Sequence, residues 1–178
     1  IKLSKGLGLV FKMITELPQI TVSAVEGPAM AGAFGIVCSS DLVLSMSSAR
    51  FAMTETRLGL SPAQIAPYVI DRLGFSNARK LILLGFSIDG NQAYDMGLTD
   101  YLSTTKEEFN ETLNSIKRQV NQCAPHALTL TKNIIRPRNE IDIDLSAKIF
   151  ADCIESEEGK EGIKSFFEKK KPYWAVRS

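Results

Sequence analysis

The sequence of 178 residues has almost no net charge and very little histidine. Lys and Arg total 21 against 20 Asp and Glu, which gives a formal net charge of +1. This balance excludes the chain-wide basic field of nucleic-acid-binding proteins, so we expect no nucleic-acid partner. The single histidine, His126, excludes a site built from several imidazoles, and we expect no metal.

Long apolar runs and paired cysteines are missing as well. The charge-free run over residues 27–40 is too short, and too rich in Gly and Ser, to cross a bilayer, so we expect no membrane partner. The three cysteines form no C-x-x-C pair, and an odd number in a chain of this size indicates free thiols. We therefore expect a reducing compartment, the cytoplasm or an organelle matrix, for Cys38, Cys123 and Cys153.

Apolar residues make up 44% of the chain and charged residues 23%, the balance of a soluble globular protein with a buried core. Apolar three- and four-residue spacings predict a helix over 3–17 that Pro18 ends. A stretch of small residues over 27–35 opens into a helix over 32–40. The Ser61-Pro62 pair predicts a helix start. Further helices are expected at 61–73, 76–84 and 89–96, and strands at 20–25, 41–45, 50–54 and 99–103.

The composition changes after Lys106, where charged amphipathic helices follow one another without a convincing strand between them. No internal repeat, low-complexity segment or flexible linker separates the two parts of the chain. The sequence therefore predicts an α/β fold over residues 1–104, followed by a helical region over residues 105–178. The helices of that region are expected at 106–123, 125–136, 142–156 and 159–170.

Two features of the first part could carry chemistry. The backbone N–H of Gly32, among small residues at the start of a helix, is a candidate anion or oxyanion site. The alternative is tight packing of that helix against a strand. Glu55, at the end of the predicted strand, could face a pocket and act as a general acid or base. Alternatively, Glu55 is a solvated acid that pairs with Arg57.

An ordered series of motifs runs along nearly the whole chain. Residues 18–33 lead from a strand that follows proline into a Gly-rich turn, and Asp41 and the stretch 51–55 come next. Residues 87–93 begin a helix, and residues 158–172 form a closing segment rich in Gly and Lys. In this order and spacing the motifs resemble the signature of the crotonase family, the enoyl-CoA hydratases and isomerases. Leu-Gly or Gly-Leu steps between them lie at 58–60, 73–74, 84–85 and 97–98.

The resemblance implies a crotonase-like spiral of stacked strand-strand-helix turns, followed by a C-terminal helical trimerisation region. It also implies a homotrimer or homohexamer and an acyl-CoA thioester as small-molecule substrate. Coenzyme A would be part of that substrate, and no separate cofactor is expected. The family pattern makes Gly32 the second of two backbone donors that hold the thioester oxygen as it becomes an enolate. The segment of the first donor is absent, so we expect the N-terminal part of the fold upstream of residue 1. The alternative is an incomplete oxyanion hole.

The same resemblance places family glutamates at two positions, of which Glu55 matches one and Gly35 occupies the other. Glu55 alone supports one proton transfer and leaves the activation of water without its second acid. Single-glutamate 3,2-enoyl-CoA isomerases share the context of residues 55–59, and glutaconyl-CoA-type hydratases share the longer stretch 60–69. The longer likeness favours a hydratase of enoyl- or glutaconyl-type CoA thioesters. A non-catalytic, crotonase-like module that binds acyl-CoA is the alternative from another class.

Four substrate-binding residues are expected in the first part of the chain. Ala31 and Gly35 lie beside the proposed donor on the same Gly-rich turn and helix. Gln64 and Tyr68 belong to the stretch that resembles the glutaconyl-type hydratases, and they could meet a polar or carboxylated acyl tail. For Gln64 the alternative is a residue on a helix surface.

Two further substrate-binding residues are expected near the C-terminus. The resemblance matches Phe166 and Lys169 to an aromatic and a basic residue that contact the adenine of CoA, often across a subunit boundary. The lysines at 169–171 could serve the phosphates of CoA. Alternatively, they are a solvated helix end whose charge complements the helix dipole.

Overall fold

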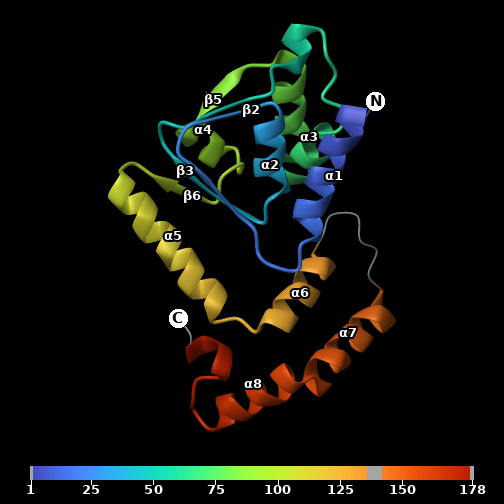
Figure 1. The fold of residues 1–178 in the computed structure, drawn as a ribbon, viewed down its shortest axis with the longest axis vertical. Helices are drawn as coiled ribbons and strands as arrows, with labels where there is room; N and C mark the ends of the chain where they lie inside the picture. The colour runs from blue at the N-terminus through green and yellow to red at the C-terminus, as the bar shows by residue number, and fades with distance from the viewer. Residues whose placement is uncertain (1, 136–141, 177–178) are drawn as a thin grey trace. The chain divides into compact units, whose positions relative to one another are not determined.

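The computed structural model describes residues 2–135 and 142–176, which form two compact units (Figure 1). The first unit comprises the chain up to Leu17 together with Thr21–Leu113. The second comprises Pro18–Ile20 together with the chain from Asn114 onward. Both sheets lie in the first unit, and the described elements of the second unit are helical.

Two three-stranded sheets support the first unit. In one sheet β1 (Val22–Val25), β3 (Leu42–Met46) and β6 (Tyr101–Ser103) run parallel in that order. In the other, β4 pairs in parallel with β2 and antiparallel with β5. The first four strands alternate between the sheets, and helices follow the first two pairs, so the α/β class is confirmed. The strands of the second sheet are β2 (Pro28–Met30), β4 (Arg50–Ala52) and β5 (Ser87–Asp89).

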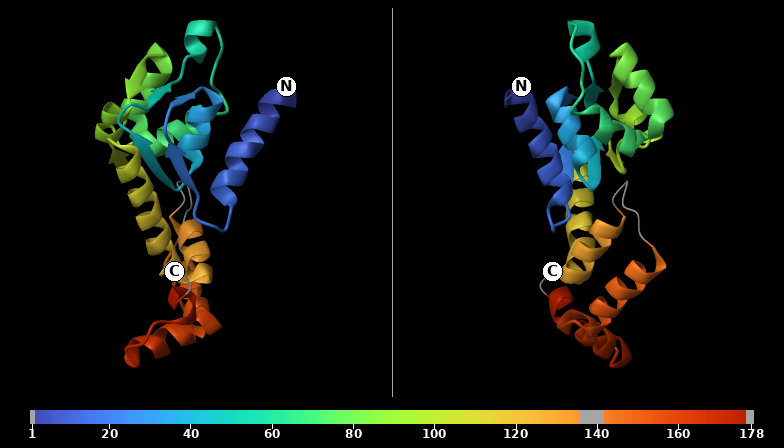
Figure 2. Two further views of the ribbon diagram at one scale, coloured as in Figure 1. Left: turned by 60° about the vertical axis from the view of Figure 1, so that its left-hand side comes forward. Right: turned by 90° about the vertical axis from the view of Figure 1, so that its right-hand side faces the viewer.

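Four helices and one 3-10 helix pack around these sheets. Helix α2 (Gly32–Ser39) packs against both α1 (Lys2–Glu16) and α3 (Ala66–Leu84), and α1 and α2 lie next to each other (Figure 2). The 3-10 helix η1 (Glu55–Leu58) contacts α3, and α4 (Gly90–Asp95) follows β5. The core between them is apolar. Its largest fully buried side chains include Phe11, Phe34, Phe51, Leu81, Ile88 and Leu98.

Arg72 joins α3 to the all-parallel sheet. Its Nη1 donates to the carbonyls of Ser40 and Asp41, at 3.2 Å each, and its Nε donates to the carbonyl of Leu98 at 3.1 Å. Its Nη2 lies 2.6 Å from Oδ2 of Asp100, and only 12% of the Arg72 side chain is exposed. A guanidinium presents several donors in a fixed fork, which suits it to satisfy several acceptors at once.

The predicted start of a helix at Ser61-Pro62 is wrong. The first turns after Pro62 are irregular, with N–H groups of Ile65 and Ala66 donating to its carbonyl, and α3 begins at Ala66. Pro67 accounts for the difference, because a proline lacks an N–H and fits only the first turn of a helix. Gly74 interrupts the helix as expected, with φ 69° and ψ 160°, but α3 continues beyond it to Leu84.

Two strands were not predicted. Residues 28–30 were assigned to a run of small residues, and residues 87–89 to the approach of a helix, but they form β2 and β5. A strand of three residues is too short to display the alternation of apolar and polar residues on which strand prediction relies. Glu55 was expected at the end of a strand, whereas β4 ends at Ala52 and Glu55 begins η1.

The chain enters the second unit along α5 (Lys106–Asn121). The side chains of Asp142 and Ser156 cap the N-termini of α7 and α8 by accepting hydrogen bonds from backbone N–H groups. Ser156 explains why α8 begins earlier than the predicted residue 159. Residue 136, the end of another predicted helix, lies outside the described residues. The elements that follow α5 are α6 (Pro125–Ile134), α7 (Ile143–Glu155), α8 (Glu157–Phe167) and η2 (Tyr173–Val176).

Hydrogen bonds rather than a large core connect the elements of the second unit. Lys132 is 4% exposed, and its Nζ donates to the carbonyl of Gln19 at 2.9 Å. The backbone N–H of His126 donates to the carboxylate of Glu158 at 2.7 Å, which ties α6 to α8. Among the described residues no helix is long and apolar enough to cross a membrane. The division of the chain at residue 104 into a core and a trimerisation region stays a prediction.

Replacing Arg72 by Met should lower the free energy of unfolding by about 3 kcal/mol, because three carbonyls and a carboxylate lose a donor. The control is Arg50→Met. Arg50 is half-exposed and 3.7 Å from Asp89, so its loss should change stability by about 0.5 kcal/mol or less. Unfolding in urea measures both variants, and equal midpoints for the two would contradict the role of Arg72.

Candidate active site

The pairing of β2 with β4 brings the two predicted catalytic groups to one edge of a sheet. Met30 at the end of β2 pairs with Ala52 at the end of β4, and the two strands are parallel. Gly32 begins α2 two residues after β2, and Glu55 begins η1 three residues after β4. Because the carboxyl ends of parallel strands meet at the same edge, both groups leave the sheet there.

The turn before α2 has an unusual backbone. Ala31 has φ 49° and ψ −116°, a conformation that residues other than glycine rarely adopt. Two hydrogen bonds hold it in place: its N–H donates to the carbonyl of Ala52 at 3.1 Å, and its carbonyl accepts from the N–H of Gly35 at 3.1 Å. Within the described part of the chain, no acceptor takes the N–H of Gly32. That N–H lies at the positive end of α2 and can bind an anion or oxyanion.

Glu55 is buried, with 9% of its surface exposed. Its Oε2 is shielded from solvent and has no hydrogen-bond partner among the described residues. The backbone around it is fixed, since its carbonyl accepts from Leu60 N–H at 2.9 Å and Gly59 closes η1 in the left-handed conformation. Arg57 donates instead to the carbonyl of Leu84 at 3.1 Å. Oε2 of Glu55 is therefore neither solvated nor paired with Arg57, and it is available to a ligand.

Gly35, the third predicted residue of this edge, faces α1. A Cβ at position 35 would lie 2.5 Å from Cζ of Phe11, so the aromatic ring occupies the space of a side chain. A Cβ at Gly32 would lie 3.6 Å from Cδ1 of Leu7, an ordinary contact. Helix α2 itself contains no acidic residue. Gly35 thus allows α1 to approach α2 closely, whereas a Cβ would fit at Gly32.

Gln64 and Tyr68, the residues expected near an acyl tail, also face α1. Nε2 of Gln64 donates to Oγ of Ser4 at 3.3 Å, and its Oε1 occupies the space that a Cβ on Gly8 would need. The ring of Tyr68 stands edge-on to Phe11, with centroids 5.5 Å apart. Both side chains are half-buried. Gln64 is accordingly packed against α1 and is not a freely solvated residue of a helix surface.

Phe166 and Lys169, the residues expected at the CoA adenine, belong to the second unit. Phe166 is 78% exposed and stands edge-on to Phe167 at 5.7 Å. Lys169 adopts φ 54°, and its N–H donates to the carbonyl of Phe166 at 3.2 Å, which ends α8. An exposed ring and a cation are thus presented together after this helix.

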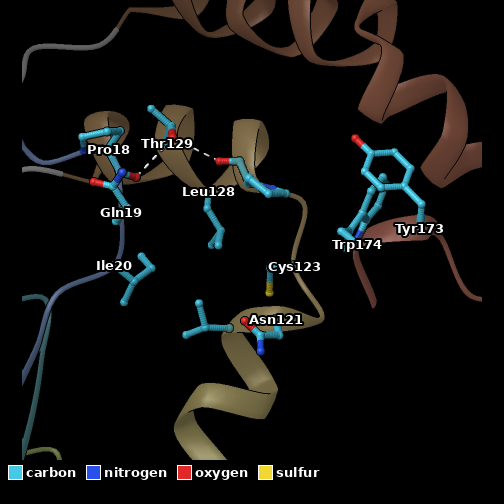
Figure 3. A pocket seen from close by; sticks show the side chains of 11 residues that line it. Pro18, Gln19, Ile20, Asn121, Cys123, Leu128, Thr129, Tyr173 and Trp174 are labelled. Carbon is cyan, nitrogen blue, oxygen red and sulfur yellow. Dashed lines mark hydrogen bonds between the residues drawn. The ribbon is translucent and has the colours of Figure 1, made fainter. Parts of the chain in front are cut away.

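The second unit also contains a cavity of about 470 Å³ (Figure 3). Figure 3 shows the Pro18 segment on one side and the Tyr173–Trp174 pair on the other, with Leu128 between them. Hydrogen bonds hold its walls: Thr129 Oγ1 donates to the carbonyl of Pro18 at 3.1 Å, and Trp174 Nε1 donates at 3.2 Å to the carbonyl of Gln122, the residue after α5. No residue predicted for the site lines this cavity.

Two features of the site were missed in the sequence. The positive φ of Ala31 has no signal in a run of small residues, since nothing distinguishes it from the other alanines there. Phe11 was expected only as one apolar residue of an amphipathic helix. The described residues contain no cluster of His, Cys, Asp or Glu that could hold a metal. Burial raises the pKa of the Cys38 thiol to about 12, against the opposing charge of Arg72, so this thiol is not a nucleophile.

Comparisons with known proteins agree on one family. The model of the enoyl-CoA hydratase/isomerase family matches residues 3–177. The chain is 30% identical over 167 residues to the short-chain-enoyl-CoA hydratase of Clostridium acetobutylicum, covering 91% of this chain and 64% of that protein. It is 27% identical over 168 residues to the methylmalonyl-CoA decarboxylase of Escherichia coli, covering 90% and 64%. The chain thus spans a little under two thirds of these relatives.

A solved structure agrees with the fold. The crystal structure of an enoyl-CoA hydratase/isomerase from Marinobacter aquaeolei matches with a TM-score of 0.93 and 36% sequence identity. The match covers 98% of this chain and 67% of that one. The crotonase-like fold with its C-terminal helices is thereby confirmed.

Replacing Ala31 by Gly should raise the free energy of unfolding by about 1 kcal/mol, because glycine adopts a positive φ without the steric cost of a Cβ. The control is Ala33→Gly in the first turn of α2, where the same change should destabilise by about 0.5–1 kcal/mol. Thermal unfolding measures both. Destabilisation by Ala31→Gly equal to that of the control would show that Ala31 is not strained.

Proposed function

Since the chain belongs to the enoyl-CoA hydratase/isomerase family, we propose that it acts on acyl-CoA thioesters as a hydratase of the enoyl or glutaconyl type. One observation carries the proposal. Glu55 is a buried carboxylate whose Oε2 has no hydrogen-bond partner in the described chain. Glu55 follows β4. The parallel neighbour of β4 is β2, which leads to the unpaired N–H of Gly32.

In the proposed reaction the Gly32 N–H donates to the thioester oxygen. The partial positive charge at the start of α2 stabilises the negative charge that develops there. Glu55 removes a proton from water while the water oxygen bonds to C3 of the enoyl group. The electron pair of the double bond moves toward the thioester and gives an enolate. Glu55 then returns the proton to C2, so one water has been added and the carboxylate is restored.

A 3,2-enoyl-CoA isomerase is the second candidate. Here Glu55 removes a proton from C2 of a 3-enoyl thioester and returns it to C4, while Gly32 holds the enolate. The lack of any acidic side chain on α2 favours this candidate, because a double-bond shift needs no activated water. A non-catalytic module that binds acyl-CoA is the third, and an absence of turnover with measurable binding would indicate it.

The remaining predicted residues contribute to binding in this proposal. Ala31 and Gly35 shape the turn and the helix beside the thioester, and Gln64 and Tyr68 lie on the side of the acyl tail. Coenzyme A is part of the substrate, with no separate cofactor. The exposed aromatic and basic groups after α8 would contact its adenine and phosphates. These two groups are Phe166 and Lys169.

A homotrimer or homohexamer is proposed as the assembly, in the cytoplasm or an organelle matrix. Helices α7 and α8 leave large apolar side chains exposed, which a monomer would present to water. On α7 the acidic and basic residues lie on the face opposite Phe150. A second copy of the chain would cover this apolar set, which includes Ile143, Phe150, Ile154, Ile163 and Phe167.

Glu55→Gln should reduce turnover of an enoyl-CoA about 10²–10⁴-fold, because the amide neither accepts nor returns a proton. Hydration is followed as loss of the ultraviolet absorbance of the conjugated thioester, and isomerisation of a 3-enoyl thioester as its gain. The control is Glu26→Gln, since Glu26 is half-exposed and paired with Lys106 on the surface. Full turnover by Glu55→Gln would refute the assignment of Glu55.

Phe150→Asp should dissociate the assembly, because the charge would be buried in an apolar contact. Lys148→Asp on the opposite face of α7 is a larger change of charge, and it should leave the assembly intact. Sedimentation measures the mass against three or six protomers. If the two variants sediment alike, the apolar face is not the interface.

A further inference from the structure

Phe11 of α1 is pressed against Gly35 of α2. A Cβ at position 35 would lie 2.5 Å from Cζ, 2.7 Å from Cε1 and 3.1 Å from Cε2 of the ring, and real Cβ atoms essentially never show the first two distances. The ring is fully buried and stands edge-on to Tyr68, so any shift of the ring would disturb packed neighbours. The ring therefore fills the volume in which any side chain at position 35 would begin.

A side chain at position 35 would point toward the proposed oxyanion donor. Gly32 and Gly35 lie three residues apart on one face of α2. The Cα–Cβ bond of a helical residue tilts toward the N-terminus, so a side chain at 35 would extend over the turn that contains Gly32. Phe11 thus occupies a position from which a second functional group could reach the reacting atoms.

We propose that Phe11 is a specificity-determining residue: it fills the space at position 35 from which a second acid could reach the site, so Glu55 is the only acid–base group that the described residues supply there. The inference rests on the function proposed above. Gly35 has an ordinary helical φ, and glycine inside a helix is destabilising relative to alanine. The ring of Phe11 therefore explains why position 35 is a glycine, and the backbone conformation of Gly35 does not. Helix α2 supplies no carboxylate, because its sequence contains neither Asp nor Glu.

A single carboxylate restricts the reactions that the site can perform. Glu55 must take a proton from one atom before it can give that proton to another, so acid and base cannot act at the same moment. Substrates that form the enolate as an intermediate satisfy this order. These are thioesters whose reacting double bond is conjugated to the thioester, or becomes conjugated to it. For reactions that need a donor and an acceptor together, the described residues offer no second group beside Glu55.

The contact is tested first without substrate, by a cycle of Gly35→Ala and Phe11→Leu. Gly35→Ala should lower the folding equilibrium constant at least about tenfold more in the parent protein than beside Phe11→Leu, where the smaller side chain makes room. Phe109→Leu, an equally buried phenylalanine outside this contact, should leave the effect of Gly35→Ala unchanged. Equal effects of Gly35→Ala with and without Phe11→Leu overturn the proposal.

The role in catalysis is tested by adding an acid where the ring was. The protein with Phe11→Leu, Gly35→Glu and Glu55→Gln should turn over an enoyl-CoA at least about tenfold faster than that with Phe11→Leu and Glu55→Gln alone. No gain in a folded protein overturns the proposal, and so does a triple variant that fails to fold. If the parent and Glu55→Gln turn over equally, the proposed function fails instead, while the stability cycle still reports on the contact.

Discussion

The parallel pairing of β2 with β4 is the interaction on which the rest of the site depends. Three residue pairs fix its register, and the N–H of Ala31 extends it by one bond of 3.1 Å to the carbonyl of Ala52. Beyond these residues one strand becomes α2 and the other becomes η1. The Gly32 N–H and the Glu55 carboxylate therefore leave the sheet at the same edge. A shift by one residue would turn successive side chains to opposite faces and separate the two groups.

Several parts of this edge are unfavourable by themselves. Ala31 has a positive φ, Glu55 has a buried oxygen without a partner, and Gly35 weakens the helix in which it lies. They persist because the surroundings are well determined. The ring of Phe11 packs into the space at Gly35, and the guanidinium of Arg72 satisfies acceptors on three other segments of the unit. Local strain and buried polar groups of this kind are typical of functional sites in otherwise consistent folds.

Prediction from the sequence succeeded where a signal extended over a turn of helix or more. The helices at 3–17 and 106–123 agree with α1 and α5 within two residues at each end, because their apolar spacing repeats several times. It failed where a signal was short or ambiguous. Strands β2 and β5 have three residues each. The Ser61-Pro62 pair and Pro67 both indicate the start of a helix, and the helix begins beside Pro67. Glu55 lies in η1 and not at a strand end, because β4 ends at Ala52, two residues before the predicted end at 54.

The sequence by itself determined the α/β class, the family resemblance, and the choice of Gly32 and Glu55 as candidate catalytic groups. Those inferences rest on residue types and their order, which are properties of the chain alone. Only the tertiary structure decided that Gln64 packs against Gly8, that Ala31 is strained, and that the ring of Phe11 excludes a side chain at position 35. These depend on how closely segments far apart in sequence approach, and close packing sets that distance through the shapes of all the neighbouring side chains.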